Sequence, residues 1–339
     1  MTTLRKTFYN SFFSHIYIEK EALNYPITKT ILAHYPNAAI VMIDHYKDVF
    51  NRRQQNYREQ KNTPSLILAV NPTTGIYEGS AACQNFGNDN FYYTSGVMNC
   101  IYDCEYCYLQ GMYPSANMVV FVNLADSFHE ILKLLKKQKV YLCISYDTDL
   151  LALESWLGYV KCWNEFAVSN KELTIECRTK SASVNQLKTL IPSNNFILAW
   201  TLSPPAVQKT YEHNTPSFSN RLTAIEKAIE LGFTIRLCFD PLLRVPDWKK
   251  EYEEMFTAIF QRIPAKHILD VSLGCFRVPA DFMKVMRKQN KESLVLNFPY
   301  TSEKGILSYR SEESEEILSY CLFLLTKWIK EDNIYVWKE

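Results

Sequence analysis

Six short apolar runs, alternating with segments of helical periodicity, constrain the fold of this chain more than any other feature. The runs FYYTS, VYLCIS, LTIEC, FILAWTL, FTIRLCFD and HILDVSL have the length and residue types of buried strands. The segments between them include NLADSFHEILKLLKK, RLTAIEKAIEL and KKEYEEMFTAIFQRI, whose apolar residues recur on one helix face. Strands joined by helical crossovers indicate a parallel sheet, so we predict an α/β fold built on a partial (β/α)6 TIM-like barrel.

The chain before and after this repeat has a different pattern. HIYIEKEAL and AAIVMIDHY have strand character and flank a helical ITKTILAHY, so we predict a small N-terminal α/β lobe over residues 1–88. The partial barrel then covers residues 89–295, and a hairpin with a C-terminal helical extension covers residues 296–339. Within the lobe, KDVFNRRQQNYREQKN is polar and lacks apolar periodicity, which indicates a solvated loop or helix.

The composition of the chain sets only broad limits on its fold, partners and location. The chain has 339 residues, 47% of them hydrophobic, so it can bury a large core, and its net charge of +1 gives no global basic field. No apolar run approaches the roughly 20 residues of a membrane span, and the first residues lack the apolar core of a signal peptide. We expect a cytoplasmic monomer without membrane contact. Seven of the ten cysteines are scattered singly along the chain, and we interpret these seven as reduced thiols.

The stretch SGVMNCIYDCEYCYLQGMYP places Cys100, Cys104 and Cys107 in the loop after the first barrel strand. In folds of this type, chemistry collects at the carboxyl ends of the strands. Structural zinc sites use four ligands, commonly two separated cysteine pairs, but here the triplet has no second pair or nearby histidine. Three thiolates on an iron–sulfur cluster instead leave one iron open to a small molecule. Three unrelated core cysteines are the remaining interpretation.

The C-x3-C-x2-C spacing resembles that of the radical S-adenosylmethionine superfamily. The resemblance implies a [4Fe-4S] cluster held by Cys100, Cys104 and Cys107, with S-adenosylmethionine bound to the open iron as the second cofactor. It also implies reductive cleavage of this cofactor to methionine and a 5′-deoxyadenosyl radical, with electrons from a donor such as flavodoxin or ferredoxin.

Three further stretches narrow the resemblance: YIEKEALNYP, CEYCYLQ followed by MVVFVN, and YEHNTPSFSNRLTAIEKAIELGF. Together they look like the spore photoproduct lyase family, from about residue 15 to about residue 290. The resemblance implies a carbon–carbon lyase that acts on UV-damaged DNA in the spore core or germinating cell. Members of this family take a hydrogen from C6 of 5-thyminyl-5,6-dihydrothymine, revert the lesion to two thymines and regenerate S-adenosylmethionine.

The resemblance also implies roles for single residues. Tyr106 matches a tyrosine near the cofactor, and Tyr108 matches one that relays hydrogen. Lys180, in ECRTKSAS, matches a lysine that contacts the cofactor's carboxylate. Thr201, at the end of FILAWTL, stands where the family has a serine that serves the cofactor. From the residues alone, ordinary loop aromatics and a solvated lysine remain the alternative interpretations.

The sequence departs from the family where a cysteine usually donates the closing hydrogen. The matching stretch CISYDTDL has Tyr146 at that position and Asp147, which we assign to cofactor binding, at the next. Cys143 lies three residues earlier, and strand alternation places it on the face opposite Tyr146. We therefore expect Tyr146, with Tyr108 nearby, to be the donor. We favour a core role for Cys143, which stays the alternative catalytic residue.

Other features leave the substrate open. The hairpin that typical members wedge into the lesion is FPYTSEKGILSYRSEE here, with few basic residues. Arg52, Arg53, Arg58 and Lys61 either grip phosphates or form a solvated face, and His213 is a candidate for substrate contact. Two alternatives to DNA repair therefore stay open: a related radical enzyme acting on another molecule, and a DNA- or zinc-binding module that uses the cysteines structurally.

Overall fold

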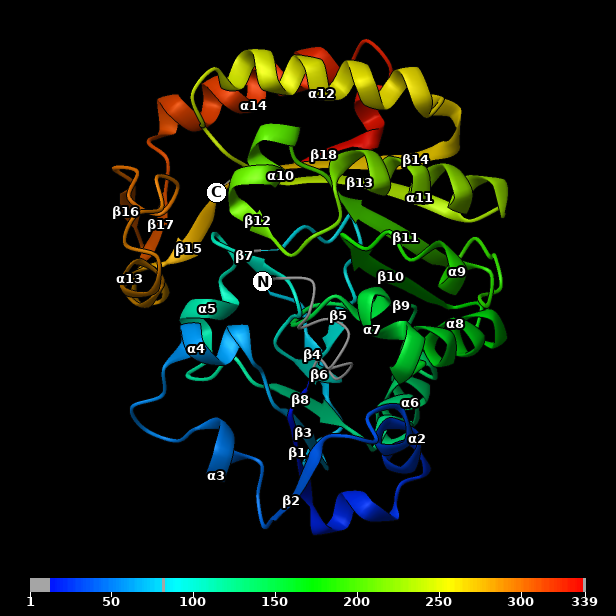
Figure 1. Ribbon diagram of the computed structural model, residues 1–339. Coiled ribbons are helices and arrows are strands. Elements are labelled where there is room, and N and C mark those ends of the chain that lie inside the picture. Colours follow the sequence, from blue (N-terminus) through cyan, green and yellow to red (C-terminus); the bar gives the residue numbers. More distant parts are fainter. Residues whose placement is uncertain (1–12, 81–82, 338–339) are drawn as a thin grey trace.

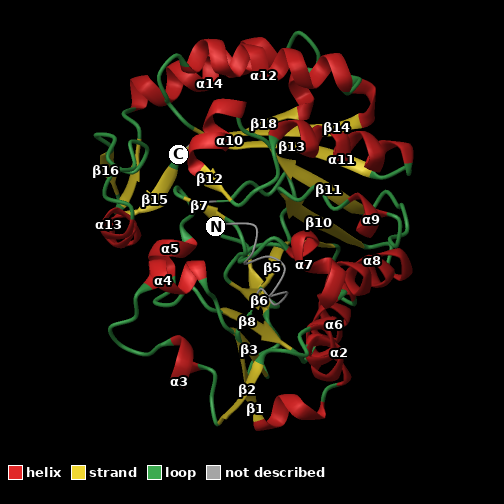
Figure 2. Ribbon diagram, viewed as in Figure 1, coloured by secondary structure: helices red, strands yellow, loops and turns green. Residues whose placement is uncertain are grey.

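The computed structural model describes residues 13–80 and 83–337, which form two main sheets with helices along their outer sides (Figure 1, Figure 2). The larger sheet has eight strands in the order β18-β14-β13-β11-β10-β9-β5-β4. Its continuous parallel run begins with six strands: β5 (Phe91–Thr94), β9 (Val140–Cys143), β10 (Leu173–Thr179), β11 (Phe196–Thr201), β13 (Thr234–Leu242) and β14 (Ile268–Cys275). These are the six strands predicted from the sequence, and the partial TIM-like barrel is confirmed.

The barrel is open along one side. β4 (Ile76–Glu78) pairs antiparallel with β5 at one edge of the sheet, and β18 (Ile334–Val336) pairs parallel with β14 at the other edge. Because β4 and β18 do not pair with each other, a seam remains between the two edges. Phe86, between β4 and β5, lies at this seam, where its ring contacts Tyr335 of β18.

Helices connect the parallel strands on the outer side of the sheet (Figure 2). This layer explains why the strand sequences are continuously apolar: β9 and β11 are buried along their whole length, as expected for parallel strands covered on both faces. The helices that follow the strands are α6 (Leu124–Leu135), α7 (Leu150–Leu157), α8 (Tyr159–Ser169), α9 (Val184–Leu187), α10 (Pro205–Tyr211), α11 (Phe218–Glu230), α12 (Trp248–Arg262) and α14 (Ser311–Leu325). Short 3-10 helices cover Ala265–His267 and Glu331–Asn333.

The smaller sheet has five strands in the order β2-β1-β3-β8-β6. The predicted strands β1 (His15–Glu19) and β2 (Ala39–Ile43) are confirmed, as is the helix α2 (Pro26–His34) between them, which follows a 3-10 helix at Lys20–Asn24. Strand pairing crosses the predicted boundary at residue 88, because β8 and β6 come from beyond it while β4 joins the barrel sheet. The remaining strands are β3 (Leu66–Ala69), β6 (Val97–Met98) and β8 (Met118–Phe121).

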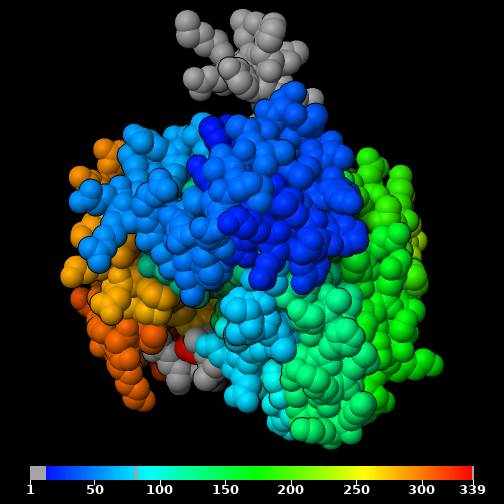
Figure 3. All heavy atoms as spheres, turned by 90° about the horizontal axis from the view of Figure 1, so that it is seen from below, coloured from blue at the N-terminus to red at the C-terminus, as the bar shows by residue number. Residues whose placement is uncertain are grey.

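Three short segments surround the cysteine loop on the side of the smaller sheet. The polar stretch 47–62 forms two short helices, α3 (Lys47–Phe50) and α4 (Tyr57–Asn62). Helix α5 (Leu109–Met112) packs against α13 (Ala280–Gln289) so closely that a Cβ on Gly111 would lie 2.6 Å from the Phe282 carbonyl oxygen. In the view from below, the N-terminal residues cover the centre of the face and lie beside the segment near residue 280 (Figure 3).

The C-terminal part contains the predicted hairpin. β16 (Thr301–Glu303) and β17 (Ile306–Ser308) pair antiparallel, and β15 (Arg277–Pro279) joins β17. Lys304 and Gly305 both have positive φ at the turn, as a two-residue hairpin loop requires. No helix within residues 13–80 and 83–337 is both long and apolar enough to cross a membrane.

Glu154 lies at the junction between α7 and α8, and its burial makes the stability of the fold depend on pH. Its carboxylate accepts hydrogen bonds from the backbone N–H of Val160 at 2.8 Å and of Lys161 at 2.9 Å. Burial nevertheless raises the pKa of Glu154 to about 7, so the folded state favours the protonated form. The stabilisation is present below the ordinary carboxyl pKa and is lost as pH rises through 7.

We expect the free energy of unfolding to fall by up to about 3 kcal/mol as the pH rises from about 4.5 to about 8, because Glu154 ionises over this range. Denaturant unfolding of metal-free protein across this range measures it. In Glu154→Gln the decrease should disappear, while Glu165→Gln, at an exposed position of α8, should keep it. An unchanged slope in Glu154→Gln would contradict the assignment.

Candidate active site

The cysteine loop lies between β6 and α5 and brings its three thiols together. The negative charges of Cys100 and Cys107 each act on the pKa of Cys104, which shows that the three sulfurs are neighbours. Burial raises the pKa of all three thiols, that of Cys100 to about 11. All ten cysteines of the chain are free thiols. Neutral, buried thiols are costly to ionise unless a bound cation compensates them, so this loop favours a positively charged group.

A cluster and a single metal ion require different arrangements of the three thiols. Within the described residues, no three Cys, His, Asp or Glu side chains are arranged to hold one metal ion. A single zinc ion requires every thiolate sulfur within about 2.3 Å of one point. An iron–sulfur cluster takes one thiolate on each of several irons, so its ligands are spread over a wider area. Cys100, Cys104 and Cys107 are the residues that would hold such a cluster.

A two-residue strand pair fixes the middle of this loop. β7 (Asp103–Cys104) pairs antiparallel with β12 (Glu212–His213), which places Glu212 opposite Cys104. The His213 imidazole lies 2.8 Å from the Glu105 carboxylate and is exposed. The sequence suggested His213 as a substrate contact, and in the structure its imidazole has a hydrogen-bonding partner on the cysteine loop.

Glu212 is the centre of a buried polar network beside the cysteines. Its carboxylate accepts hydrogen bonds from the Tyr106 hydroxyl, from Ser203 Oγ at 2.8 Å and from the Arg221 guanidinium. Burial alone would raise the pKa of Glu212, but the positive charges of Lys180 and Arg221 outweigh it and lower the pKa to about 2. Tyr106 is therefore held by a permanently ionised acceptor.

Two residues of the basic segment also support the loop. The Arg58 guanidinium donates to Asp103 Oδ2 at 2.8 Å and to Gln110 Oε1 at 3.2 Å. The Lys61 ammonium donates to the carbonyl oxygen of Cys100 at 2.6 Å. Both side chains thus hold the cysteine loop, whereas Arg52 and Arg53 are exposed.

Lys180 lies at the carboxyl end of β10, facing the cysteine loop. Its ammonium lies 5.5 Å from the centre of the Tyr106 ring. Burial lowers the pKa of Lys180, but the nearby charges of Cys104 and Glu212 outweigh burial, so the net pKa is raised and the group is cationic. No described residue accepts a hydrogen bond from this ammonium, while its backbone N–H donates to Asp149 at 2.6 Å. A cation of this kind is suited to bind an anionic ligand.

The other two predicted cofactor residues lie at neighbouring strand ends. Thr201 is buried at the end of β11, and its carbonyl oxygen accepts a hydrogen bond from Arg221 at 3.2 Å. Asp147 Oδ2 accepts from Ser95 Oγ at 2.5 Å, whereas Oδ1 is buried and has no hydrogen-bond partner among the described residues. Burial raises the pKa of Asp147. An unpartnered buried carboxylate oxygen favours a polar ligand at this position.

Three tyrosines and one thiol form a chain of contacts next to Cys107. The Tyr108 hydroxyl donates to the carbonyl oxygen of Tyr146 at 2.9 Å. The Tyr146 ring stacks on Tyr93, with 4.0 Å between ring centroids. The Tyr146 hydroxyl lies 3.3 Å from Cys83 Sγ. Sequence reasoning treated Cys83 as one of several scattered thiols and missed this contact, because its partner is 63 residues away.

Cys143 is buried, as expected for a core residue, and lies beside a carboxylate. β9 ends at Cys143, so the alternation of strand faces does not extend to Tyr146. The Cys143 thiol lies 3.9 Å from Glu176 Oε1, on the same side of the sheet as Tyr141, whose hydroxyl donates to Glu176 Oε2 at 2.6 Å. Cys143 is buried against a carboxylate and makes no hydrogen bond to a tyrosine.

Comparison with known proteins agrees with this arrangement. The family model described as spore photoproduct lyase matches residues 12–300. The chain is 25% identical over 269 residues to a spore photoproduct lyase from Clostridium acetobutylicum, covering 76% of each chain. It is 20% identical over 285 residues to the spore photoproduct lyase of Bacillus subtilis, covering 80% of this chain and 81% of the relative.

Solved structures share the fold at low sequence identity. A spore photoproduct lyase complexed with dinucleoside spore photoproduct superposes with a TM-score of 0.81 at 20% identity, over 96% of this chain and 98% of that one. A mutant with bound AdoMet and dinucleoside spore photoproduct gives a TM-score of 0.78 over the same shares. Since the family model covers residues 12–300, the chain belongs to the spore photoproduct lyase family.

Proposed function

We propose that this chain is a DNA-repair lyase that reverts spore photoproduct, 5-thyminyl-5,6-dihydrothymine, to two thymines with a [4Fe-4S] cluster and S-adenosylmethionine. The observation that carries the proposal is the unpartnered Lys180 ammonium facing a loop of three coupled thiols. The three cysteines are suited to hold a cluster, and Lys180 is suited to bind the carboxylate of the cluster's ligand. A solved structure of a mutant spore photoproduct lyase holds AdoMet and dinucleoside spore photoproduct, which supports this cofactor and this substrate.

The residues of the candidate site have different roles in the proposed reaction. Cys100, Cys104 and Cys107 hold the cluster, which when bound supplies the electron that cleaves S-adenosylmethionine and so makes the radical that removes the C6 hydrogen. Lys180 pairs with the cofactor's carboxylate, and Tyr106 keeps Lys180 in place through their 5.5 Å cation–π contact.

Asp147 and Thr201 complete the cofactor site. The unpartnered Asp147 Oδ1 is suited to accept a hydrogen bond from an amino or hydroxyl group of the cofactor. Thr201 lies at a neighbouring strand end and is held there by Arg221. Tyr108 and Tyr146 extend from the cluster ligand Cys107 and are suited to relay a hydrogen atom.

The partners follow from the reaction. UV-damaged DNA is the substrate, and an electron donor such as flavodoxin or ferredoxin reduces the cluster. The enzyme acts as a monomer in the cytoplasm of the spore or germinating cell. The lesion is approached by the hairpin of β16 and β17, where an inserted side chain would help to expose a damaged base.

A second function is favoured by two observations. Tyr146 stands where the family usually has a donor thiol, and the β16–β17 hairpin carries few basic residues. Both permit a related radical enzyme that acts on another molecule. Such an enzyme would accumulate 5′-deoxyadenosine as a spent product, whereas the lyase would regenerate S-adenosylmethionine.

Anaerobic incubation with the dinucleotide lesion tests the proposal. Reconstituted protein, S-adenosylmethionine and a chemical reductant should convert dinucleotide spore photoproduct to thymidylyl-thymidine. A cyclobutane thymine dimer, which lacks the methylene bridge, serves as the control substrate and should remain unchanged. Cofactor cleavage without thymidylyl-thymidine would favour the second function.

Lys180→Met should weaken S-adenosylmethionine binding by about 10-fold to 100-fold, because a charge-assisted hydrogen bond is worth roughly 1.5–3 kcal/mol. Calorimetric titration of the cofactor into the reconstituted protein measures the change. The matched control is Lys188→Met, which removes an exposed lysine after α9 and should leave binding unchanged. Equal affinity in Lys180→Met and wild type would contradict the assignment of Lys180.

A further inference from the structure

We propose that Arg178 determines substrate specificity, because its guanidinium donates a hydrogen bond to a ring carbonyl oxygen of the thymine lesion inside the barrel. The inference rests on the proposed function and assigns a substrate contact to a residue that has no part in holding the cluster or the cofactor. The acceptor is a neutral carbonyl oxygen and not a phosphate of the DNA backbone.

Arg178 lies on the inner face of β10. Ile175 and Cys177 of this strand belong to the large apolar core, whereas Glu176 contacts side chains of neighbouring strands on the opposite face. Alternation within the strand places Arg178 on the same face as Glu176. Lys180 directly follows β10, so Arg178 lies about 7 Å further back along the strand than the lysine assigned to the cofactor.

A buried network of ion pairs fixes the orientation of Arg178. Its Nε donates to Glu176 Oε1 at 3.0 Å, and its Nη2 lies 2.9 Å from the same oxygen. Glu176 Oε2 accepts hydrogen bonds from Arg236 Nη1 and from the Tyr141 hydroxyl, each at 2.6 Å. Arg236 in turn donates to both oxygens of Asp270, at 2.5 and 2.7 Å. The network joins β9, β10, β13 and β14, so the guanidinium is held from several strands.

One nitrogen of this fixed guanidinium remains available to a ligand. No described residue accepts a hydrogen bond from Arg178 Nη1. The Arg178 side chain is 28% exposed, whereas those of Glu176 and Arg236 are 2% and 3% exposed. Of these three, solvent therefore reaches only Arg178, although β10 lies in the middle of the sheet. An oriented N–H group that is open to solvent is suited to bind an oxygen acceptor.

The charges near Arg178 favour a neutral acceptor. The two carboxylates of the network balance its two arginines. Burial lowers the pKa of Arg178, but negative charges that include those of Glu176 and Asp240 raise it well above its ordinary value. Asp240 is itself paired with Arg277, at 3.0 and 3.1 Å. Because these charges cancel, an anionic ligand would add an unbalanced charge, whereas a carbonyl oxygen would not.

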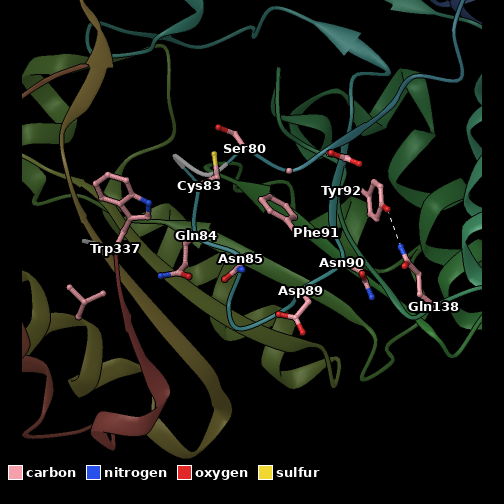
Figure 4. Close-up of a pocket in the computed structure, with 13 residues that line it drawn as sticks. Ser80, Cys83, Gln84, Asn85, Asp89, Asn90, Phe91, Tyr92, Gln138 and Trp337 are labelled. Carbon is pink, nitrogen blue, oxygen red and sulfur yellow. Dashed lines mark hydrogen bonds between the residues drawn. The ribbon is translucent and has the colours of Figure 1, made fainter. Parts of the chain in front are cut away.

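A cavity at the seam of the barrel comes close to the Asp240–Arg277 pair. Its volume is about 610 Å³, within the size range of small-molecule sites. Trp337 borders the cavity (Figure 4), and its ring centroid lies 3.9 Å from Arg277 Cζ. The described residues that line the cavity include Glu78 and Asp89 but no lysine or arginine. Such a lining suits a neutral base better than a phosphate.

The rings of the lesion supply the neutral acceptor. Both rings of 5-thyminyl-5,6-dihydrothymine keep their carbonyl oxygens before and after the methylene bridge breaks. A hydrogen bond from Arg178 to one of them would hold the lesion near the cofactor site. Because the reaction leaves this acceptor unchanged, Arg178 should contribute to binding the substrate and not to breaking its bonds.

Binding of the lesion to the unreduced holoenzyme tests the inference. Reconstituted protein with S-adenosylmethionine and no reductant is titrated calorimetrically with dinucleotide spore photoproduct, so that no turnover occurs. Arg178→Met should weaken lesion binding by about 10-fold to 100-fold and leave the affinity for S-adenosylmethionine unchanged. The control is Arg262→Met, which removes an ion-paired arginine of similar exposure on α12 and should leave both affinities unchanged.

Arg178→Lys separates recognition from folding. A lysine keeps a positive charge beside Glu176 but lacks the second, fixed edge of a guanidinium. Denaturant unfolding should therefore be close to that of wild type, while lesion affinity falls as in Arg178→Met. Wild-type lesion affinity in both variants would overturn the inference. An equal loss of affinity for lesion and S-adenosylmethionine would also overturn it, because Arg178 would then be only the countercharge of Glu176.

Dinucleoside spore photoproduct, which lacks the phosphate, distinguishes the two acceptors. If Arg178 binds a ring carbonyl, Arg178→Met should weaken binding of the dinucleoside and of the dinucleotide by the same factor. A loss for the dinucleotide alone would assign Arg178 to the phosphate and contradict the inference. Failure of wild type to bind either form would instead contradict the proposed function, on which the inference rests.

Discussion

Cys104→Ala should abolish cofactor cleavage and lesion repair, because it removes one of three thiolates that hold the cluster. Cys104 is the most enclosed of the three, in the strand pair of β7 with β12, so no other described cysteine stands ready to replace it. Iron content and the brown charge-transfer absorption should fall after anaerobic reconstitution.

The matched control for this variant is Cys321→Ala. Cys321 is a buried thiol of α14, far along the chain from the loop, and its loss should leave iron content unchanged. Full iron content and full cleavage activity in Cys104→Ala would show that the cysteine triplet is not the cluster site.

Arg221→Met should lower the free energy of unfolding by about 3–5 kcal/mol, because it leaves a buried carboxylate without its countercharge. The side chains of Arg221 and Glu212 are 1% and 0% exposed, and their contact joins α11 to the strand beside Cys104. Denaturant unfolding of the metal-free protein measures the loss. The cysteine loop should also become less ordered, which would lower iron uptake on reconstitution.

An ion pair on the same helix is the control. Arg262 and Glu226 join α12 to α11 with side chains 33% and 32% exposed, and Arg262→Met should cost no more than about 1 kcal/mol. In the double variant Arg221→Met, Glu212→Gln, much of the stability should return, because the buried carboxylate that lost its hydrogen-bonded partner is also removed. Equal small losses in Arg221→Met and Arg262→Met would contradict the importance of the buried pair.

The sequence predicted most of the barrel because the patterns that indicate strands and helices are local in the chain. Each of the six parallel strands is a continuous apolar run, and the helix at 124–135 has apolar residues on one face. The local sequence of a strand does not determine which sheet the strand joins. The run MVVF has the same apolar character as the barrel strands, but it forms β8 and pairs with β3 in the smaller sheet. Periodicity does not reveal which strand a buried strand pairs with.

The candidate site also has one part that the sequence predicts and another that only the fold brings together. Cys100, Cys104 and Cys107 lie within eight consecutive residues, so their spacing alone indicated a common site. Glu212, Arg221 and Cys83 reach their partners through the fold. Arg221 had one visible sign, a charged residue on the inward face of an otherwise regular helix pattern. Cys83 had none.

Cys143 is buried, as predicted, but strand alternation is not the reason that it lies away from Tyr146. Alternation of side chains holds only within a strand, and β9 ends before Tyr146. The chain turns after Cys143, and the rule of opposite faces no longer relates the two side chains. The structure consequently points to Cys83, a thiol from a different segment, as the neighbour of Tyr146.

The most direct test of the lyase function is the ratio of repaired lesion to consumed cofactor. Reduced, reconstituted protein is incubated with dinucleotide spore photoproduct and a limiting amount of S-adenosylmethionine, and both thymidylyl-thymidine and 5′-deoxyadenosine are quantified. We expect thymidylyl-thymidine to exceed the 5′-deoxyadenosine formed, because the cofactor is regenerated after each repair. Accumulation of 5′-deoxyadenosine without thymidylyl-thymidine would contradict the lyase function and favour another substrate.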